Sequence, residues 1–513
     1  MNSNSLLLLF VLVSVALAWK GKAPLDAKTG PFWGGYQKHD NDGENAFSGV
    51  HDVCVIGAGA SGMSAAAFLK DEGADVVVIE SQSDIGGYCN TVQFAPPAPG
   101  APAWIDIGVG IFPNSSAANA SGFGNWALDT VAFANRFAVG YARGAVIPVT
   151  APTGLALNFD FQNGINYGYP PDVPPPPEYE EAFFVFYELI LQYPFLNQGI
   201  WPDPIPAELL VSFNQWVANN QLQALYPGLF YGLVVIAGFT DLDNTPAIYP
   251  LYNMAPSVIS FLTTNNTVFS IYNGCYQIYD GIRNYLGTDN VLVNANIRMA
   301  TRPQAGNGHI NLLVENDNRI RPVFCKNLII SHPQVLSDID YLQPDQTEIN
   351  VFQHVSVSLY YVAAVDFDSG MFDGQVVQIN NFNLGNPYFY PNWPAITNIM
   401  RPLPYGPGAI SACSNSSISN SAMLAVIQSQ LRNAMPALFS EAEITIYKPH
   451  DKFGPHFDLQ SLKASPNIYT QLNNLQGYRN TYYIGALVNA ANSAALWDRS
   501  YAFIQKYKSK LLA

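Results

Sequence analysis

Three glycines and one acid near the start of the sequence have the types and spacing that bind a dinucleotide. Gly57, Gly59 and Gly62 form a G-x-G-x-x-G run that includes Ser61, and Glu80 follows 18 residues after Gly62. In such a run the first glycine permits a tight turn, the second lets a pyrophosphate approach the backbone, and the third lets a helix pack closely on a sheet. A carboxylate at this spacing accepts hydrogen bonds from a ribose diol.

These residues need a strand, a helix and a second strand to hold them, and the sequence supplies each in order. The apolar run 53–56 predicts a buried parallel strand, and residues 63–72 predict a helix directly after the glycines. A second apolar run, 74–79, ends just before Glu80. The first N–H groups of the helix have no partner within it and lie at its positive end, so they face the phosphates. The stretch 51–94 therefore predicts a Rossmann-type dinucleotide-binding unit.

A second pair of glycines narrows the identity of the dinucleotide. Gly86 and Gly87 begin six residues after the acid, and Thr91, Asp106 and Gly108 follow. The E-x5-GG-x3-T run and the D-x-G triplet resemble the two-dinucleotide-binding-domain flavoproteins and, among them, the flavin amine oxidase superfamily. The sequence looks most like the polyenoic fatty acid isomerases and the β-cyclopiazonate dehydrogenase-like proteins. The resemblance implies FAD as the cofactor, with its pyrophosphate beside the second glycine pair.

Some positions depart from the superfamily's pattern. Amine oxidases usually carry arginine two residues before the glycine pair and directly after it, where this sequence has Asp84 and Tyr88. Many also carry an acid after a C-terminal glycine, where this sequence has Ala486. Polar contacts would come there from Asn489, Asn492 and Ser493. These departures bear against a simple amine oxidase more than against FAD binding.

The C-terminal segment and one middle strand complete the implied cofactor site. Residues 481–485 predict a short strand that ends in Gly485, and residues 494–510 predict a helix. The resemblance implies that this helix begins at the polar edge of the flavin, where its dipole would stabilise the anionic reduced form. It also implies that Ile297, on a strand predicted over 290–299, contacts adenine through its backbone; an ordinary apolar strand residue fits Ile297 equally well.

The resemblance implies that FAD supplies the redox chemistry while the protein positions the substrate. The shared step is removal of a hydride from an activated carbon to the flavin N5 atom. In an isomerase of polyunsaturated fatty acids the hydride returns to another carbon of the same molecule. In an amine oxidase or a dehydrogenase of a small metabolite the electrons pass to an acceptor. A third class, a secreted binding protein, holds FAD without catalysis.

The sequence shows no acid–base dyad, so the catalytic residues stay unassigned. Arg136, Arg143 and Arg401 are candidates to hold a fatty acid carboxylate. Cys89 lies next to the second glycine pair. We expect a small packed side chain there, with a redox or covalent role as the alternative.

Composition bounds the function classes. The sequence of 513 residues is 49% hydrophobic and 12% charged, which predicts a folded protein with a large core and more than one domain. Its formal net charge of −15 makes it a poor partner for nucleic acid and for anionic membrane surfaces. We therefore expect a small apolar organic substrate, no nucleic acid partner and no stable membrane insertion. The composition does not indicate an oligomeric state.

The first 18 residues predict export. Residues 6–15 form an apolar core of signal-peptide length, and small residues at 16–18 permit cleavage; an uncleaved anchor is the alternative. Glycosylation sequons agree with a secreted or secretory-pathway protein. They lie at Asn114, Asn119, Asn265 and Asn415.

The cysteines and two histidines show no metal-site spacing. Cys54, within the first strand, is expected to be a buried thiol. The spacing indicates no disulfide framework, and it leaves open one or two bridges of unassigned pairing among the other four cysteines: Cys89, Cys275, Cys325 and Cys413. His450 and His456 flank a glycine–proline turn and are expected to be solvated loop residues rather than metal ligands.

The remaining pattern predicts an α/β fold, namely a Rossmann-like FAD-binding domain of the two-dinucleotide-binding-domain flavoprotein type with an inserted α+β substrate domain. Helices are predicted over 125–139, 180–195, 206–225, 254–263, 276–286 and 421–435, and strands over 311–315, 327–331, 355–365 and 375–382. The proline-rich stretch 169–179 predicts a stiff connector, with a ligand for a partner module as the alternative.

The two predicted domains alternate along the chain. A signal peptide (1–18) and an N-terminal arm (19–50) precede them. The FAD-binding domain is expected to comprise three segments, 51–112, 265–340 and 476–513. The substrate domain is expected to comprise the two segments between them, 113–264 and 341–475.

Overall fold

The computed structural model describes residues 47–513, apart from 100, 121, 123, 139–145, 149–154, 169–177, 264–267, 305–307, 367–374, 435, 437–443 and 489–491. The predicted signal peptide, the N-terminal arm up to residue 46, most of the proline-rich stretch and the sequon at Asn265 lie outside the described residues. No helix in the described part of the chain is both long and apolar enough to cross a membrane.

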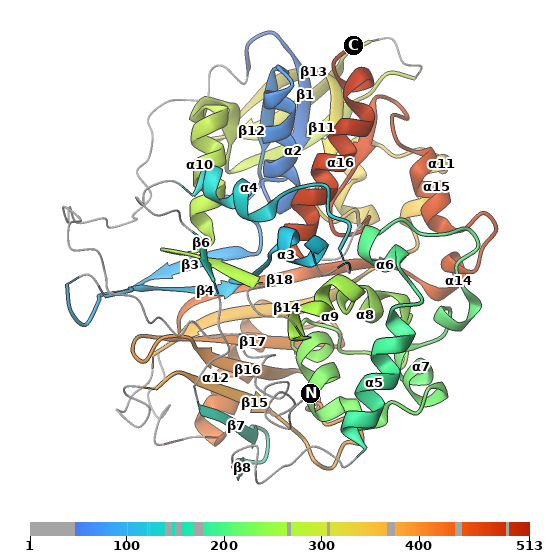
Figure 1. The fold of residues 1–513 in the computed structure, drawn as a ribbon. Coiled ribbons are helices and arrows are strands. Elements are labelled where there is room, and N and C mark those ends of the chain that lie inside the picture. Colours follow the sequence, from blue (N-terminus) through green and yellow to red (C-terminus); the bar gives the residue numbers. More distant parts are fainter. Residues whose placement is uncertain are drawn as a thin grey trace.

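A seven-stranded sheet carries the predicted dinucleotide-binding segments (Figure 1). Its parallel strands run in the order β10 (Val291–Leu292), β2 (Val76–Ile79), β1 (Val50–Ile56), β13 (Arg319–Ile330) and β19 (Thr481–Tyr483). The antiparallel strands β12 (Ile310–Asn316) and β11 (Ala295–Thr301) continue the sheet from the first half of β13. All four side chains of β2 are buried, as expected for a strand that is covered on both faces.

Three helices from distant parts of the sequence cover one face of this sheet. They are α2 (Ala60–Asp71), α10 (Tyr276–Leu286) and α16 (Ser493–Leu511), and α2 packs against both of the others (Figure 1). Val53 and Val55 belong to the apolar cluster that includes these helices. Cys54 and Ile56 belong to a second apolar cluster, on the opposite face of the sheet. The alternation of side chains along β1 thus joins two apolar clusters through one strand.

A second seven-stranded sheet lies below the first in Figure 1. Its order is β18 (Ile444–Phe457), β14 (Val355–Val365), β17 (Gly408–Ser414), β16 (Ala395–Arg401), β15 (Val377–Asn381), β7 (Leu155–Asp160) and β8 (Ile165–Gly168). Neighbouring strands are antiparallel except for β15 and β7, which are parallel. Helix α12 (Asn420–Ala434) packs on this sheet through Met423, Ile427 and Leu431.

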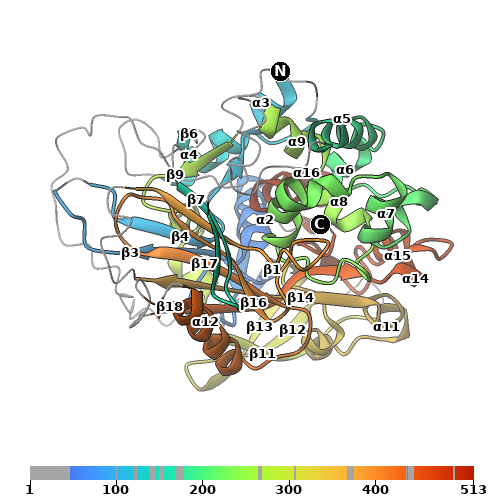
Figure 2. The same cartoon turned by 90° about the horizontal axis from the view of Figure 1, so that it is seen from below.

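Helices from the middle of the chain gather on one side of the second sheet (Figures 1 and 2). They are α5 (Tyr179–Ile190), α6 (Phe195–Gln198), α7 (Phe213–Asn219), the π-helical segment η4 (Tyr226–Val235), α8 (Ile248–Asn253) and α9 (Pro256–Thr263). Smaller elements connect these regions: the hairpin β3 (Cys89–Gln93) and β4 (Trp104–Gly108), the small sheet of β5 (Phe112–Pro113), β9 (Val268–Ile271) and β6 (Val146–Pro148), and the helices α3 (Ser115–Ala120), α4 (Thr130–Phe137), α11 (Gln346–Phe352), α14 (Leu459–Leu462) and α15 (Ile468–Asn474).

Several predicted elements differ from the structure. The helix predicted over 206–225 is wrong as a single element, because the hydroxyl of Ser212 caps a new helix, α7, and Gln221 has a φ of +57° directly after it. The helix predicted over 180–195 ends at Ile190. The strand predicted over 290–299 divides into β10 and β11, because Asn294 between them has a φ of +51°.

A buried ion pair lies behind the last strand of the first sheet. Arg302 follows β11, and its guanidinium donates to both carboxylate oxygens of Glu348 on α11, at 2.5 and 2.8 Å. Tyr483 of β19 donates its hydroxyl hydrogen to the same carboxylate at 2.7 Å, and Arg302 also donates to the Thr481 hydroxyl at 3.2 Å. The position of β19 is therefore fixed by charge-assisted hydrogen bonds as well as by the sheet.

Candidate active site

The carboxyl ends of the parallel strands meet along one edge of the first sheet. Backbone hydrogen bonds of 2.9 Å join the residues just beyond these strands: Gly57 N–H to Ile79, Ser331 N–H to Ile56 and Ile484 N–H to Ile330. Ligands of open parallel sheets bind at this edge. The first glycine run, Ser331 and the segment that begins at Gly485 therefore lie side by side along this edge of the sheet.

The three glycines of the first run have different structural roles. Gly57 has a φ of +101°, and a β-carbon there would lie 2.8 Å from the Ser331 hydroxyl. A β-carbon on Gly62 would lie 1.9 Å from the Gly57 carbonyl oxygen, so this turn can close only without a side chain there. Gly59 differs, because its φ is −79° and its β-carbon would meet only Gly87 Cα, at 3.8 Å. The packing of the described residues therefore does not require glycine at position 59.

The second glycine pair lies across from the first run. Gly86 and Gly87 have φ values of +96° and +60°, and Gly86 N–H donates to the Ala58 carbonyl at 2.8 Å. A β-carbon on Gly87 would approach Gly59 Cα to 3.0 Å. Two backbone segments without side chains thus face each other; we call Gly57, Gly59, Gly62, Gly86 and Gly87 the glycine cradle.

The start of α2 leaves bonding capacity for an anion at this cradle. The helix has 12 residues, begins after Gly59 and has no side-chain cap. The Ser61 hydroxyl in its first turn is buried and has no hydrogen-bond partner among the described residues. Uncapped N–H groups, a positive helix end and an unpartnered hydroxyl beside bare backbone together fit a pyrophosphate.

Glu80 supports the glycine turn from the end of β2. Its Oε2 accepts a hydrogen bond from Ala58 N–H at 2.7 Å, and its Oε1 accepts one from Gln82 N–H at 2.8 Å. The Ser81 hydroxyl also donates to Oε1, at 3.3 Å, so about one of the roughly four acceptor sites of the carboxylate remains for a ribose hydroxyl. The sequence indicates the ribose role but not the bond that holds the turn.

Ile297 lies on β11, and Gly485 follows β19 after one intervening residue. Ile297 is a partly buried residue of β11, paired with Val314 in the register with β12. Just before Ile297, Ala295 N–H donates to the Glu80 carbonyl at 2.8 Å, which ties this strand to the acid. Gly485 has a φ of +105°, and a β-carbon there would lie 2.6 Å from the Ser331 carbonyl oxygen.

The motif residues Thr91 and Asp106 form a buried support behind the second glycine pair. Thr91 donates its hydroxyl hydrogen to Asp106 Oδ1 at 2.6 Å, and Cys275 N–H donates to Asp106 Oδ1 and Oδ2 at 3.0 and 3.2 Å. Burial raises the pKa of Asp106 to about 7, against the opposing effect of these hydrogen bonds. These contacts join the hairpin β3–β4 to the start of α10.

Two disulfides correct the sequence-based expectations for the cysteines. Cys54 bonds to Cys325, so the prediction of a buried thiol at Cys54 is wrong. Cys89 bonds to Cys275, so Cys89 is not a free side chain beside the cradle. The partners are 271 and 186 residues apart in the sequence, and only the folded sheet and the packing of α10 bring them together.

An aromatic cavity lies beside the Gly485 end of the cradle edge, where Ala486 forms part of its wall. The cavity is lined by residues of α8, β18 and α15, by residues that follow η4, and by Ala486 after β19. We define the aromatic cavity by its lining residues: Trp201, Ala237, Phe239, Tyr249, Tyr252, Asn253, Phe453, Gly454, Pro455, His456, Tyr469 and Ala486. No motif marks these residues, which come from separate segments of the chain.

Tyr249 and His456 at this wall form hydrogen bonds with neighbouring residues. Tyr249 oxygen accepts from Phe457 N–H at 2.8 Å and from the Tyr469 hydroxyl at 3.2 Å. His456 donates from Nδ1 to the Gly454 carbonyl at 2.9 Å. The rings of Tyr249 and His456 lie with centroids 5.3 Å apart.

The histidine prediction is wrong, because both histidines belong to the long strand β18 rather than to a loop. His450 is 8% exposed, and burial lowers its pKa to about 4. Burial also lowers the pKa of His456. The described residues contain no cluster of three or more metal-ligating side chains.

The arginines that the sequence suggests as partners for a fatty acid carboxylate do not line the aromatic cavity. Arg136 forms two hydrogen bonds to Asp71, at 2.6 and 2.7 Å. Arg401 is buried, and its Nε donates to the Gly406 carbonyl at 3.1 Å. Arg143 lies outside the described residues.

Of the three polar residues predicted to replace the acid after Gly485, the structure describes Asn492 and Ser493. Asn492 caps α16, because its side chain accepts from Ala495 N–H at 3.2 Å. Ser493 is the first residue of that helix and is buried. Asn489 lies outside the described residues.

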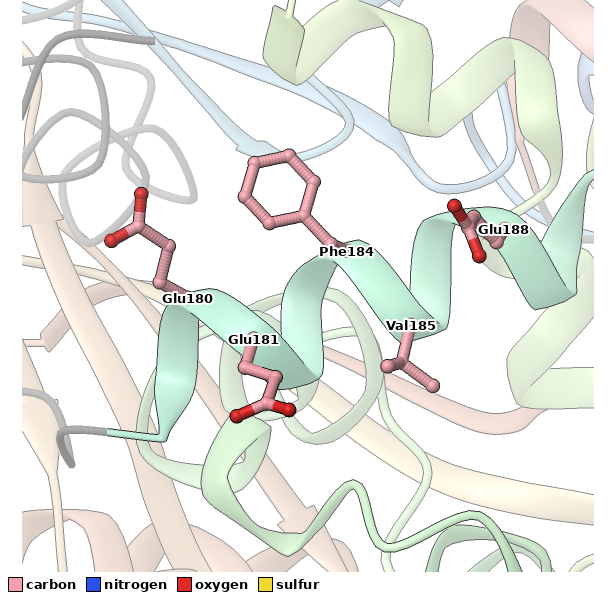
Figure 3. A pocket seen from close by; sticks show the side chains of 5 residues that line it. All are labelled: Glu180, Glu181, Phe184, Val185 and Glu188. Atoms are coloured by element: carbon pink, nitrogen blue, oxygen red, sulfur yellow. The ribbon is translucent and has the colours of Figure 1, made fainter.

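A second hollow lies on the outer face of α5 and differs from the aromatic cavity. Figure 3 shows Glu180, Glu181 and Glu188 with Phe184 and Val185, and the side chains project away from the helix. Phe184 and Val185 are 45% and 40% exposed. The side chains of these five residues offer no hydrogen-bond donor, so they do not form the polar end of an anion site.

Comparison with known proteins agrees with the geometry of the edge. A family model described as an NAD(P)-binding Rossmann-like domain matches residues 55–123. An uncharacterized protein of Acanthamoeba polyphaga mimivirus is 32% identical over 471 residues, 89% of this chain and 93% of that protein. An FAD-dependent oxidoreductase of Cochliobolus heterostrophus is 24% identical over 463 residues, 87% and 89% of the two chains. The β-cyclopiazonate dehydrogenase of Aspergillus flavus is 25% identical over 455 residues, 87% and 90% of the two chains.

Solved structures share the fold over nearly the same length. The CLA-producing fatty acid isomerase from P. acnes matches with a TM-score of 0.67 at 16% identity, over 89% of this chain and 98% of that chain. Cyclohexylamine oxidase from Brevibacterium oxydans matches with a TM-score of 0.59 at 14% identity, over 90% and 100% of the two chains. The predicted α/β class with a Rossmann-like domain is confirmed.

Proposed function

Because the chain belongs to the FAD-dependent oxidoreductases of the flavin amine oxidase superfamily, we propose that it moves a hydride between the flavin and an apolar organic substrate in the aromatic cavity. The chain is a flavin enzyme, and FAD is its cofactor. The observation that carries the proposal is the position of Ala486, which follows Gly485 at the cradle edge and also lines the aromatic cavity.

The cofactor would lie along the carboxyl edge of the first sheet. The glycine cradle and Ser61 would hold the pyrophosphate, and Glu80 would accept from the ribose. Ile297 would lie at the adenine end and Gly485 at the flavin end. The support for this placement is the bare backbone at Gly59 and Gly87, the unpartnered Ser61 hydroxyl and the free acceptor capacity of Glu80.

The first specific form of the proposal is double-bond isomerisation of a polyunsaturated fatty acid. When bound, FAD supplies a centre that takes up and returns a hydride. The aromatic walls would hold the reacting segment and exclude water, so that the same molecule receives the hydride back. The predominantly apolar lining supports this form.

The second form is net oxidation of a small apolar metabolite, with electrons passed to an acceptor. The hydrogen bonds of Tyr249 and His456 favour it, because they place polar groups at an otherwise aromatic wall. The positions of Arg136 and Arg401 agree with this second form, because neither arginine lines the cavity, where it could bind the carboxylate of a fatty acid.

Anaerobic incubation of the FAD-loaded protein tests the proposal. A polyunsaturated fatty acid should give ultraviolet absorbance of conjugated double bonds without an added acceptor if the enzyme is an isomerase. A panel of apolar alcohols and amines should bleach the flavin if it is an oxidase or dehydrogenase. Filling the cavity with Ala237→Phe should abolish either reaction and leave FAD affinity unchanged. A protein that binds FAD and turns over no member of either panel would refute the proposal.

We also propose that the protein passes through the secretory pathway. Asn119 and Asn415 are exposed, and Asn114 is partly buried at the start of α3. Two disulfides agree with an oxidising compartment. Expression in secreting eukaryotic cells should yield protein that begins at Trp19 and loses mass on removal of N-linked glycans. Retention of residues 1–18 would favour an uncleaved anchor.

A further inference from the structure

We infer that Tyr249 and His456 form a donor–acceptor pair that selects a hydroxyl group on the substrate carbon to be oxidised, and that His456 accepts the hydroxyl proton. The inference rests on the proposed function and commits to its oxidative form. It assigns a substrate class, neutral apolar alcohols, and one catalytic residue.

Tyr249 has a hydroxyl hydrogen to donate. Its oxygen accepts hydrogen bonds from Phe457 N–H and from the Tyr469 hydroxyl, and these occupy its acceptor positions. No described residue accepts a hydrogen bond from Tyr249, and its ring lines the aromatic cavity. Burial raises the pKa of Tyr249, so this hydrogen is present throughout the neutral range.

His456 has a lone pair to offer. The Gly454 carbonyl can only accept, so Nδ1 of His456 must carry the hydrogen of their 2.9 Å bond. Burial lowers the pKa of His456, although Asp458 opposes this effect, so the ring is neutral and Nε2 is an acceptor. Among the described residues no donor to Nε2 is present.

The ring centroids of Tyr249 and His456 lie 5.3 Å apart at one wall of the aromatic cavity, close enough for one substrate group to contact both residues. A hydroxyl matches, because its oxygen accepts from Tyr249 while its hydrogen is donated to His456. An ammonium has no lone pair for Tyr249, and a carboxylate has no hydrogen for His456. The aromatic remainder of the cavity would hold an apolar body.

The implied reaction is the two-electron oxidation of an alcohol to a carbonyl compound. FAD, when bound, would supply the two-electron oxidant: the C–H bond of the carbinol carbon would break, and its electron pair would leave as hydride to the flavin. The O–H bond breaks, and its proton passes to Nε2 of His456. A carbon–oxygen double bond forms, and Tyr249 keeps its hydrogen and donates it to the new carbonyl oxygen. General base assistance of this kind contributes about 10²- to 10⁴-fold to a rate.

Four compounds that share a phenyl ring and differ in the attached group test the selection of a hydroxyl group on the FAD-loaded protein. They are benzyl alcohol, toluene, benzoate and benzylammonium. Dissociation constants are measured anaerobically from the perturbation of flavin absorbance. Benzyl alcohol should bind at least about tenfold more tightly than each of the others. His456→Phe should abolish this preference, whereas Phe453→Leu, an apolar change in the same wall, should retain it.

Steady-state rates with an artificial electron acceptor test the proton transfer. His456→Gln keeps an acceptor oxygen, so KM for benzyl alcohol should stay within about threefold while kcat falls at least about 100-fold. Equal affinity for toluene and benzyl alcohol, or an unchanged preference and kcat in His456→Phe, would overturn the inference. If the His456→Phe variant isomerises a fatty acid as fast as the wild type, the proposed function stands. The assignment of alcohol selection to Tyr249 and His456 is then overturned. If benzyl alcohol binds preferentially and this preference depends on His456, but none of the four compounds reduces the flavin, the selection of a hydroxyl group stands. The proposed hydride transfer is then overturned.

Discussion

Replacing Gly59 with alanine tests the glycine cradle, because the protein's own packing tolerates the added methyl group. The φ of Gly59 is −79°, which alanine adopts without strain, and the new β-carbon would meet Gly87 Cα at 3.8 Å. The free energy of unfolding of the cofactor-free protein should therefore be unchanged, or rise by up to about 1 kcal/mol because alanine restricts the unfolded chain.

The affinity for FAD should fall, because the methyl group occupies the space through which the pyrophosphate approaches the backbone. Loss of one hydrogen bond to a charged group costs about 1.5–3 kcal/mol. That cost corresponds to a dissociation constant about 10- to 150-fold higher. Titration of cofactor-free protein with FAD, followed by quenching of FAD fluorescence, measures it.

Gly385→Ala serves as the matched control. Gly385 lies on an exposed loop, and a β-carbon there would meet only the Asn383 side chain, at 3.1 Å. This variant should bind FAD as the wild type does. If Gly59→Ala unfolds at the wild-type temperature and still binds FAD with wild-type affinity, the cradle does not hold the pyrophosphate.

Three further predictions concern the supports of the site. The pKa of Asp106 is raised from 3.8 to about 7 in the folded protein, so the folded state binds the proton more tightly, and stability should fall by up to about 4 kcal/mol as pH rises from 4 through 7. Asp106→Asn keeps the acceptor oxygen and should flatten this pH dependence in denaturant titrations; an unaltered slope would assign it to other groups. Glu348→Gln leaves Arg302 buried without its charge partner and should cost about 3–5 kcal/mol in urea unfolding, whereas a cost below about 1 kcal/mol would contradict the ion pair. Cys54→Ser opens the link to Cys325 and should lower the free energy of unfolding by about 2–5 kcal/mol, an effect that should vanish if the wild type is compared under reducing conditions.

Local signals suffice for the elements that hold the cradle. The glycine spacing and the apolar runs predict β1, α2 and β2, and the alternating pattern of 355–365 matches β14. These segments are long or fully buried, so periodicity and burial agree. The helix predicted over 206–225 is wrong because single residues decide it: the Ser212 cap and the left-handed Gln221 outweigh the apolar pattern.

The rest of the candidate site depends on contacts that the sequence does not display. The partners Cys54 and Cys325 are 271 residues apart, so no spacing rule links them. The aromatic cavity draws Trp201, Tyr249 and His456 from segments that come together only in three dimensions. The glycine–proline turn before His456 is the one local signal, and it favours a solvated loop, whereas β18 extends through the turn.

The buried ion pair connects the two halves of the candidate site. Glu348 accepts from Arg302 and from the Tyr483 hydroxyl, and Tyr483 ends the strand that leads directly into Gly485. Gly485 contacts the Ser331 backbone at the cradle edge, and Ala486 lines the aromatic cavity. A shift of β19 would therefore move the wall of the cavity relative to the cradle. For this reason Glu348→Gln, although it contacts neither site, should raise the dissociation constants for both FAD and benzyl alcohol, whereas Gly59→Ala should raise the first without changing the wall that binds the second.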